Sequence, residues 1–498
     1  MPANFKSSPV EFNQSLLFPD NVFDLLAKDN ECYLFHDLFQ QLDTTALEVQ
    51  YSPKGQNAYH PRLIVSILIY AYSRGVFSSR EIERRCYEDL TFMYIAGMNC
   101  PNFRVLSDFR KDNAPFFHNC FKQTVRLAME LKLASLGHIS LDGSKFKASS
   151  SKHKAMSYGR LKEKEQQLTK EIEALIAQAS HCDKEEEQAY QDNNGYELRD
   201  DLKFKEARLA QIKTAKEALE KREELIHPGK TIEDKKQISF ADKDARIMGK
   251  KGDFDYRYNP QISVDGDNQI IVGQHVSQNT NDKKELAPAL EAVKEATGRS
   301  PEKLSMDNGY MSGDNLQTTQ IAGIDTYIAT DKGEKSNKVY LDDPERKLVK
   351  SDFEYNQDTN NFSCPGGQVL VMIKETKGGS RAYQGDSTTC NECPYQTRCC
   401  QSTKGLARTI STDDKEPLRQ KMNSKMEKDE SKAIYKERKV IVEPVFGQIK
   451  NTGSRGFSVR GKDNVAGEFS LVCATHNIKK MIRAMFTGVI PLKIENMA

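Results

Sequence analysis

Hydrophobic positions at helical spacing dominate the first part of the chain. The apolar run from Leu63 to Tyr72 follows His60-Pro61 and precedes Gly75, which is typical of a helix that begins at proline and stops at glycine. Ser78 and Glu81 have the spacing of a capping box, so a second helix begins there. This second helix carries three arginines: Arg80, Arg84 and Arg85.

A helix, a short turn and a basic helix together predict a DNA-binding helix-turn-helix, with a plain helical hairpin as the alternative. A further helix begins at Pro115. Its apolar stripe consists of Phe116, Phe117, Cys120, Phe121 and Val125. We therefore expect residues 1 to about 135 to form an all-helical N-terminal domain.

The pattern changes after Gly137, where short strands end in acidic residues. Residues 138–142 predict a strand that ends in Asp142-Gly143, and 304–306 predict one followed by Asp307-Asn308-Gly309. Since both dipeptides favour tight turns, turn chemistry is the alternative to a metal-binding role for either aspartate. No strand pattern follows Asp142 for about ninety residues, which disfavours a hairpin there.

Further strands and a helix complete a mixed α/β pattern. Two alternating runs, 258–264 and 270–276, flank the turn Asp265-Gly266. A helix follows over about 284–297 and a short strand over 324–329. We expect residues 136–330 and 426–490 to form one catalytic core.

Two insertions interrupt this core. Residues 155–227 carry two apolar stripes joined by a polar link, which predicts an antiparallel helical hairpin resembling a short coiled coil. It is either a structural arm or a dimer contact. The second insertion, 331–425, is rich in Lys, Asp, Gly and Ser and holds five of the 11 cysteines.

The spacing of these cysteines favours structural zinc. Cys390-x2-Cys393 is a metal-binding pair, and Cys364 precedes it after a hairpin-length gap. Cys399 and Cys400 follow, and one of them, Cys399 in our primary assignment, would complete four ligands. Free thiols that hold no metal are the alternative.

The stretch from Tyr435 to Lys450 concentrates a phenol, a carboxylate and several cations. Glu443 and Lys450 are seven residues apart, so both lie on one helix face. Arg438 has the planar fork that binds phosphate. Pro444 either opens a helix or kinks a longer one. A solvated amphipathic helix with ordinary ion pairs is the alternative to a metal and phosphate site.

The distribution of charge along the chain indicates a binding surface, whereas the net charge does not. The net charge of the 498 residues is +2, but residues 431–498 hold 12 Lys and Arg against 5 Asp and Glu, which favours a phosphate-facing surface. The longest apolar run is too short to span a membrane and no signal peptide is apparent, so we expect a cytoplasmic protein with reduced thiols.

Taken together, these motifs resemble the DDE transposases of bacterial insertion sequences, most closely the insertion-sequence 1182 group. The resemblance covers nearly the whole chain, including the motifs around Leu106-Ser107-Asp108-Phe109-Arg110, Asp242-x-Asp244-Ala245-Arg246 and Val442-Glu443-Pro444. It implies a ribonuclease-H-like core in which Asp142, Asp307 and Glu443 form the acidic triad. Such a triad would bind Mg²⁺ or Mn²⁺, with two ions expected.

The resemblance also implies a Tyr-Arg-Glu-Lys signature at Tyr435, Arg438, Glu443 and Lys450. Four residues separate Arg438 from Glu443, where the wider superfamily has three. Expected partners are double-stranded DNA, as terminal inverted repeats and as target, and a second copy of the chain in the DNA complex. The protein would then associate with the bacterial nucleoid. The alternatives are a DNA-binding regulator without chemistry and a metal-dependent nuclease that does not join DNA.

Overall fold

The structure is a computed structural model that describes residues 21–51, 58–150, 155–186, 195–249, 252–330, 346–376, 378–400 and 407–491. The chain forms two compact units. The first contains Met1–Phe109 and Ile478–Ala498, and the second contains Arg110–Asn477. Helices and mixed sheets are both present, as the sequence predicts. No helix in the described ranges is long and apolar enough to cross a membrane.

The first unit is helical throughout its described part. Its elements are η1 (Val22–Leu25), α1 (Glu31–Gln40), α2 (Thr45–Glu48), α3 (Pro61–Ser73), α4 (Ser79–Glu88), α5 (Leu90–Ile95) and the start of α6 (Phe103–Asp112). An aromatic core holds them together: Tyr70 of α3 contacts Phe35 of α1 and Phe92 of α5 edge to face, with ring centroids 5.2 and 5.1 Å apart. Residues 1–20, which we predict to belong to the helical N-terminal domain, lie outside the described residues.

Both predicted helices, α3 beginning at Pro61 and α4 following Ser78, are present. The capping hydrogen bonds predicted between Ser78 and Glu81 are not. Pro61 is the first residue of α3, and the imidazole of His60 accepts a hydrogen bond from the Arg62 amide. Ser78 precedes α4, yet its side chain makes no capping hydrogen bond. The carboxylate of Glu81 instead binds two arginines on its own helix, which are charged and therefore stronger partners than a backbone amide.

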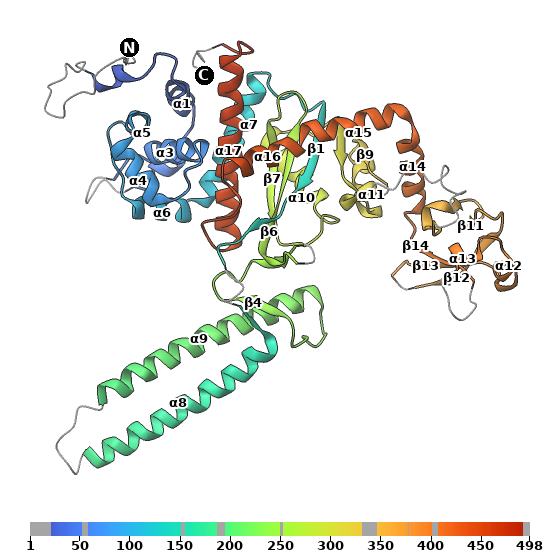
Figure 1. The fold of residues 1–498 in the computed structure, drawn as a ribbon, viewed down its shortest axis with the longest axis horizontal. Helices are drawn as coiled ribbons and strands as arrows, with labels where there is room; N and C mark the ends of the chain where they lie inside the picture. Colours follow the sequence, from blue (N-terminus) through green and yellow to red (C-terminus); the bar gives the residue numbers. More distant parts are fainter. Residues whose placement is uncertain are drawn as a thin grey trace, which may run out of the picture. The chain divides into compact units, whose positions relative to one another are not determined.

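A seven-stranded mixed sheet forms the centre of the second unit (Figure 1). Its strands are β1 (His138–Gly143), β2 (Phe146–Lys147), β5 (Arg246–Met248), β6 (Asp255–Asp265), β7 (Ile271–Ser277), β8 (Lys303–Met306) and β9 (Asp325–Ile328). β6 pairs antiparallel with both β7 and β1, whereas β1, β8 and β9 run parallel. The prediction of no strand soon after Asp142 is wrong, since β2 follows almost at once, but β2 pairs with β6 and forms no hairpin with β1.

Helices pack against this sheet. They are α7 (Ala114–Glu130), α10 (Leu286–Thr297), α11 (Gly313–Ile321), α14 (Glu416–Glu427), α15 (Asp429–Ile441), α16 (Glu443–Asn451) and α17 (Lys462–Phe486). α10 packs on β7 and α7, and α15 contacts β1, β8 and β9. The stripe predicted from Phe116 to Val125 is buried. Phe146 of β2 contacts the rings of Phe446 and Phe457, which anchors α16 to the sheet.

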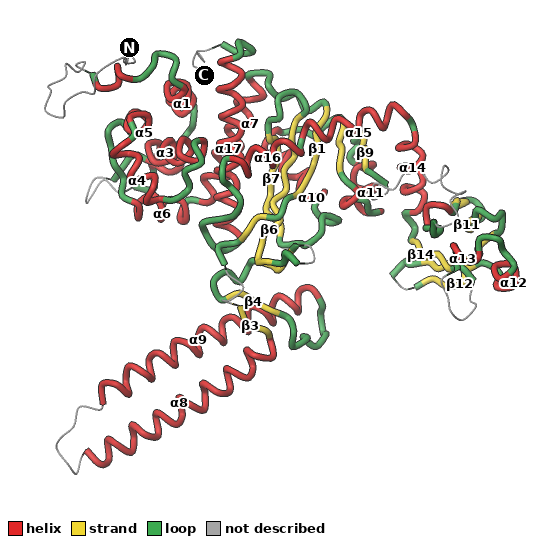
Figure 2. The backbone as a smooth tube through the Cα atoms, viewed as in Figure 1, coloured by secondary structure: helices red, strands yellow, loops and turns green. Residues whose placement is uncertain are grey.

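The first insertion is the predicted helical hairpin. Its helices are α8 (Tyr158–Glu186) and α9 (Gly195–Ile226), which lie side by side and run in opposite directions (Figure 2). A two-stranded sheet of β3 (Ala155–Ser157) and β4 (Gln237–Ser239) closes its base. Leu161, Ile212 and Leu219 are buried between the helices, whereas Ile226 at the end of α9 is exposed. The predicted link at 187–194 lies outside the described residues.

The second insertion contains a sheet that its polar composition did not indicate. Strands β10 (Glu354–Asn356), β11 (Asn361–Ser363), β12 (Val369–Glu375), β13 (Arg381–Gln384) and β14 (Thr409–Thr412) pair antiparallel in chain order. The short helices α12 (Ser387–Asn391) and α13 (Gln396–Cys399) lie between the last two strands in sequence, and η5 (Lys350–Asp352) precedes the first. Residues 331–345 lie outside the described part.

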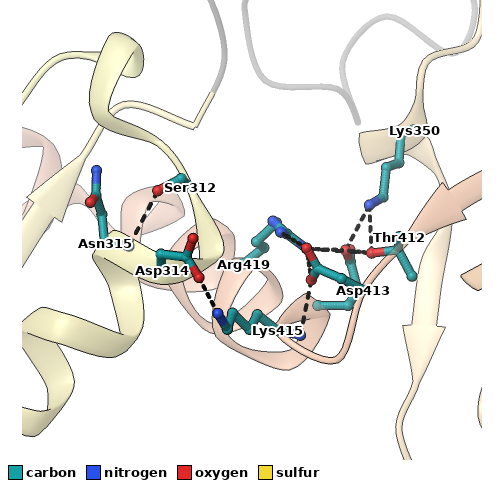
Figure 3. Close-up of polar contacts among 9 residues, drawn as sticks. Ser312, Asp314, Asn315, Lys350, Thr412, Asp413, Lys415 and Arg419 are labelled. Carbon is teal, nitrogen blue, oxygen red and sulfur yellow. Dashed lines mark hydrogen bonds and ion pairs between the residues drawn. The ribbon is translucent and has the colours of Figure 1, made fainter. Parts of the chain in front are cut away.

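The chain returns from this insertion to the core through α14, along a row of polar contacts (Figure 3). The ammonium of Lys350 donates to Thr412 and Glu416, at 2.8 and 2.7 Å. Arg419 forms an ion pair with Asp413 at 2.6 Å. Lys415 forms one with Asp314 of α11. These contacts join β14 to α14 and α14 to the core.

Candidate active site

Asp142 and Asp307 lie side by side because of the strand register. β1 and β8 are parallel, and Leu141 is aligned with Met306, so the next residue of each chain segment is an aspartate at the same end of the sheet. The Asp307 carboxylate also accepts a hydrogen bond from the Gly309 amide at 2.9 Å. The turn chemistry that we gave as the alternative is therefore present at Asp307 as well.

Arg438 connects Asp142 to Glu443. Its guanidinium lies 3.1 Å from a carboxylate oxygen of Asp142 and 3.2 Å from one of Glu443. α15 ends at Ile441 and α16 begins at Glu443, with Pro444 in its first turn. Pro444 thus opens a helix, which was one of the two predicted possibilities. The break between the two helices lets Glu443 and Arg438 face each other although only four residues separate them.

The side chain of Arg438 is 9% exposed and has one unused donor. Within the described part of the chain, its buried Nε has no hydrogen-bond partner. Leaving a buried donor unpaired costs about 1–3 kcal/mol. An oxygen of a bound phosphate would satisfy this donor.

The electrostatics of the two aspartates reflect burial and mutual repulsion. Burial raises the pKa of Asp142 to about 6, Arg438 opposes the rise, and the charges of Asp307 and Asp282 add to it. Burial also raises the pKa of Asp307, again opposed by Arg438 and increased by Asp282. Carboxylates in such an environment gain stability when a further cation binds between them.

Tyr435 and Lys450 border the same carboxylates. The pKa of Tyr435 is raised by burial, with Arg438 opposing and with Asp307, Asp142 and Glu443 adding to the rise, so its phenol lies within their field. The Lys450 ammonium hydrogen-bonds Ser144 and lies 5.2 Å from the centroid of the Phe146 ring. Burial lowers the pKa of Lys450, and the charge of Asp142 opposes this change.

Sequence reasoning missed a fourth carboxylate, Asp282. Its Oδ1 accepts hydrogen bonds from the side-chain amides of Asn259 and Gln261, at 2.7 and 2.8 Å. Its Oδ2 points toward Asp307, because the position of a Cβ on Gly309 would be 3.5 Å from Asp282 Oδ2 and 2.9 Å from Asp307 Oδ1. The ammonium of Lys145 lies 3.9 Å from Asp282.

One sequence signal pointed to this fourth acid. Asn259 and Gln261 lie in the strand β6, which is buried at most positions, and both are fully buried. A buried amide requires a partner, so a polar group had to face this strand. The sequence does not show that Asp282, in the loop after β7, is that partner.

The predicted DNA-binding arginines belong to the first unit, where each is already engaged. Arg84 pairs with Glu81 and Glu88, at 2.7 and 3.1 Å. Arg85 pairs with Glu81 and Asp89, at 3.0 and 3.2 Å. The guanidinium of Arg80 lies over the Phe103 ring, 4.9 Å from its centroid. Any phosphate would therefore compete with carboxylates for Arg84 and Arg85.

The donors at the sheet edge are of the kind that hard divalent cations prefer. Asp142, Asp307 and Glu443 offer carboxylate oxygens, which suit Mg²⁺ and Mn²⁺. Arg438 at present supplies the positive charge between Asp142 and Glu443. Among the described residues, no group of three or more His, Cys, Asp and Glu side chains has the spacing of a formed metal site. The fit to a metal therefore rests on the chemistry of the donors.

Two family models match the chain. One, described as "Transposase DDE domain", matches residues 363–482, and the other, described as "Transposase domain (DUF772)", matches residues 20–112. No curated protein and no solved structure matches the chain. The first match includes Tyr435, Arg438, Glu443 and Lys450, and the second includes the helices α3 and α4. The two matches, in separate parts of the chain, both describe transposases and together indicate a DDE transposase of the insertion-sequence type.

Proposed function

We propose that this transposase binds the terminal inverted repeats of an insertion sequence, cuts the DNA at the ends of the element and joins those ends to target DNA. The observation that carries the proposal is the convergence of Asp142, Asp307 and Glu443 around Arg438. Mobile elements of this kind move by metal-dependent phosphoryl transfer, and an acidic site beside cations suits that chemistry.

The strand order supports a ribonuclease-H-like core for this site. The order β7-β6-β1-β8-β9 has an antiparallel half and a parallel half, which meet at β1. Two of the acids lie at the end of the parallel pair, and the third comes from a helix near the end of the chain. That arrangement supports the core, and the sequence motifs are why we assign the chain to the insertion-sequence 1182 group.

Asp142, Asp307 and Glu443 would hold two Mg²⁺ or Mn²⁺ ions, and such ions would supply activation of water or a DNA 3′-hydroxyl and charge neutralisation at the leaving oxygen. The chain's own residues orient the DNA. Arg438 keeps Asp142 and Glu443 in place and presents its unpaired Nε to a phosphate. Lys450, held beside Ser144, adds a second cation on the same side. Tyr435 contacts the backbone or a displaced base.

DNA recognition belongs to the helical first unit in this proposal. α3 and α4 are two helices joined by a short turn, and α4 presents Arg80, Arg84 and Arg85. These cations would bind the phosphates that position the terminal repeats. Two copies of the chain, one at each end of the element, would assemble with double-stranded DNA.

The test is cleavage and joining of a supercoiled plasmid that carries the element ends, with Mg²⁺, by the wild-type protein and the Asp307→Asn variant. Asn keeps the size and the turn hydrogen bond of Asp307 but removes its charge. We expect normal folding and repeat binding, with cleavage and joining lower by at least about 100-fold. Asp142→Asn and Glu443→Gln should behave alike, and double variants should lose no more than single ones.

The matched control is Asp267→Asn, because Asp267 is an exposed acid in the turn between β6 and β7. It should retain full activity. Appreciable cleavage by Asp307→Asn would return Asp307 to a turn role. Wild-type protein that cuts without joining would be a nuclease, and one that binds the repeats without cutting would be a regulator.

A further inference from the structure

All five cysteines of the second insertion line one small cavity. The cavity has a volume of about 30 Å³ and lies among β11, β12, α12 and α13. That volume has room for one atom-sized guest. The thiols around it are those of Cys364, Cys390, Cys393, Cys399 and Cys400. None of them forms a disulfide in the structure.

Two glycines bring the thiols close to one another. The position of a Cβ on Gly366 would be 3.5 Å from the sulfur of Cys393 and 3.6 Å from that of Cys364, so these two sulfurs flank the same point. A Cβ on Gly385 would be 3.0 Å from the sulfur of Cys390, which is closer than most side chains tolerate. The thiol of Cys400 lies near those of Cys390 and Cys399.

In the turn that carries Cys364, a backbone amide points at the Cys364 sulfur. Cys364-Pro365-Gly366-Gly367 closes with a hydrogen bond from the Gly367 amide to the Cys364 carbonyl, at 2.9 Å. The next amide, that of Gln368, donates to the Cys364 sulfur at 3.3 Å. A backbone amide in this position can hydrogen-bond the sulfur of a metal ligand and hold it in place.

The two adjacent cysteines differ in their surroundings. Cys399 is 8% exposed and belongs to the hydrophobic core of the insertion, with Phe353, Phe362 and Ile410. Cys400 is only partly buried and packs at the margin of that core, as does Cys364, and Cys390 and Cys393 are partly buried like it. The geometry therefore favours Cys400 over Cys399, the residue of our primary sequence assignment, as a fourth ligand.

We propose that Cys364, Cys390, Cys393 and Cys400 bind one structural Zn²⁺ through four thiolates, and that Cys399 is a core residue. In the described residues no three of these side chains yet have metal-ligand spacing, so side-chain rotations toward the cavity complete the site. Four thiolates suit zinc or iron. We assign zinc because only one Cys-x2-Cys pair is present, and iron–sulfur clusters commonly use several closely spaced cysteines.

The size of the insertion explains the need for a metal. Among its described residues, one hydrophobic cluster forms the core and consists of Leu348, Phe353, Phe362, Leu370, Tyr383, Cys399 and Ile410. Modules of this size commonly require a disulfide or a metal for stability. A metal would join the β11–β12 turn to α12 and α13, and so stabilise the module from which α14 continues to α15 and Arg438. The zinc site does not depend on the proposed DNA chemistry.

The experiment measures zinc in the full-length protein, purified without chelators, and in the Cys400→Ser and Cys399→Ser variants. We expect about one zinc per chain in the wild type. Cys400→Ser should lose most of it, whereas Cys399→Ser should keep it. Replacement by Co²⁺ should give the absorption bands of a tetrahedral thiolate complex.

Wild-type protein titrated with a thiol reagent in the presence of a zinc indicator provides a measurement that needs no variant. One zinc should be released as four thiols react. Folded wild-type protein without zinc, with iron, or with disulfides among these cysteines would overturn the site. Loss of zinc from Cys399→Ser with retention in Cys400→Ser would overturn the choice of the fourth ligand.

Discussion

The guanidinium of Arg438 lies 3.1 Å from the carboxylate of Asp142, and it reaches Glu443 with its other terminal nitrogen. One buried cation thus holds together carboxylates from a strand and from a helix that are far apart in the sequence. The arrangement has a cost, because a largely buried charge is stable only while its partners remain. Replacing Arg438 should therefore show how strongly the site depends on a positive charge between these carboxylates.

The first prediction concerns Arg438→Gln. Without the guanidinium, Asp142 and Glu443 lose their shared cation, so the melting temperature should fall in metal-free buffer. Because a divalent ion supplies the missing charge, Mg²⁺ or Mn²⁺ should raise the melting temperature of the variant more than that of the wild type. Plasmid cleavage should fall by about 100-fold, since the contact to phosphate is lost.

Lys439→Gln is the matched control, because Lys439 is the next residue of α15 and is exposed. It should change neither the response to metal nor cleavage. If Arg438→Gln and Lys439→Gln respond to metal alike, Arg438 does not compensate the charge of the acids.

Local patterns predicted the two aspartates, since each follows a short hydrophobic strand and the register of parallel strands then sets them side by side. Glu443 was predicted from the cations around it and from the resemblance. The break at Val442 could not be chosen in advance, because Pro444 fits either a helix start or a kink. Helices and strands could therefore be predicted where the hydrophobic residues recur at regular spacing.

The features that the sequence did not predict depend mainly on contacts between residues far apart in the chain. Asp282 has no strand-end pattern, and only the folded structure shows that Asn259 and Gln261 bind it. In the second insertion, β10 and β11 were missed because each has three residues and two of them are polar. β12 begins with five consecutive apolar residues, a strand signal that our prediction did not use. The capping box at Ser78 failed because Glu81 has better partners in Arg84 and Arg85.

The second prediction separates the charge of Asp282 from its hydrogen bonds. Asp282→Ala leaves the buried Gln261 amide without its acceptor and leaves Asn259 with only the Asn279 carbonyl, so it should cost about 2–4 kcal/mol of unfolding free energy. Asp282→Asn retains an oxygen that can accept these bonds, and should cost about 1 kcal/mol or less. Urea denaturation measures both. Equal losses would show that Asp282 does not anchor β6.

The third prediction concerns the arginines of α4. Replacing Arg80, Arg84 and Arg85 together by alanine should weaken binding to the terminal repeats and flatten its salt dependence, with log K against log salt losing about 0.9 per lost phosphate contact. Fluorescence anisotropy at several salt concentrations measures this. Unchanged binding would move the contact surface elsewhere, for instance to the basic C-terminal stretch.

The fourth prediction is a substitution in α4 that should strengthen DNA binding. Glu81 binds both Arg84 and Arg85, so Glu81→Gln frees two guanidiniums for phosphate. This variant should bind the same DNA more tightly, by about threefold to tenfold, because charge repulsion also falls. Weaker binding would mean that Glu81 orients the arginines for DNA.

The last prediction is a pH dependence located at Glu416. Burial alone would raise the pKa of this carboxyl group, but hydrogen bonds from Lys350 and Thr412 and the charge of Lys350 outweigh it, so the pKa lies below the ordinary 4.5. A group whose pKa is lower in the folded state contributes stability above its unfolded pKa. That contribution disappears as the pH falls through the folded pKa. Glu416→Gln should therefore be less stable than the wild type near pH 7, by about 1–3 kcal/mol.

The difference between Glu416→Gln and the wild type should remain constant down to about pH 5 and shrink below it, as the wild-type carboxylate takes up its proton. Glu427→Gln, an exposed acid at the end of α14, is the control and should show no such trend. Urea denaturation at several pH values measures both variants. Since Glu416 joins Lys350 of the insertion to the helix that leads to Arg438, a difference that does not shrink in acid would mean that the contacts in Figure 3 do not stabilise this connection through charge.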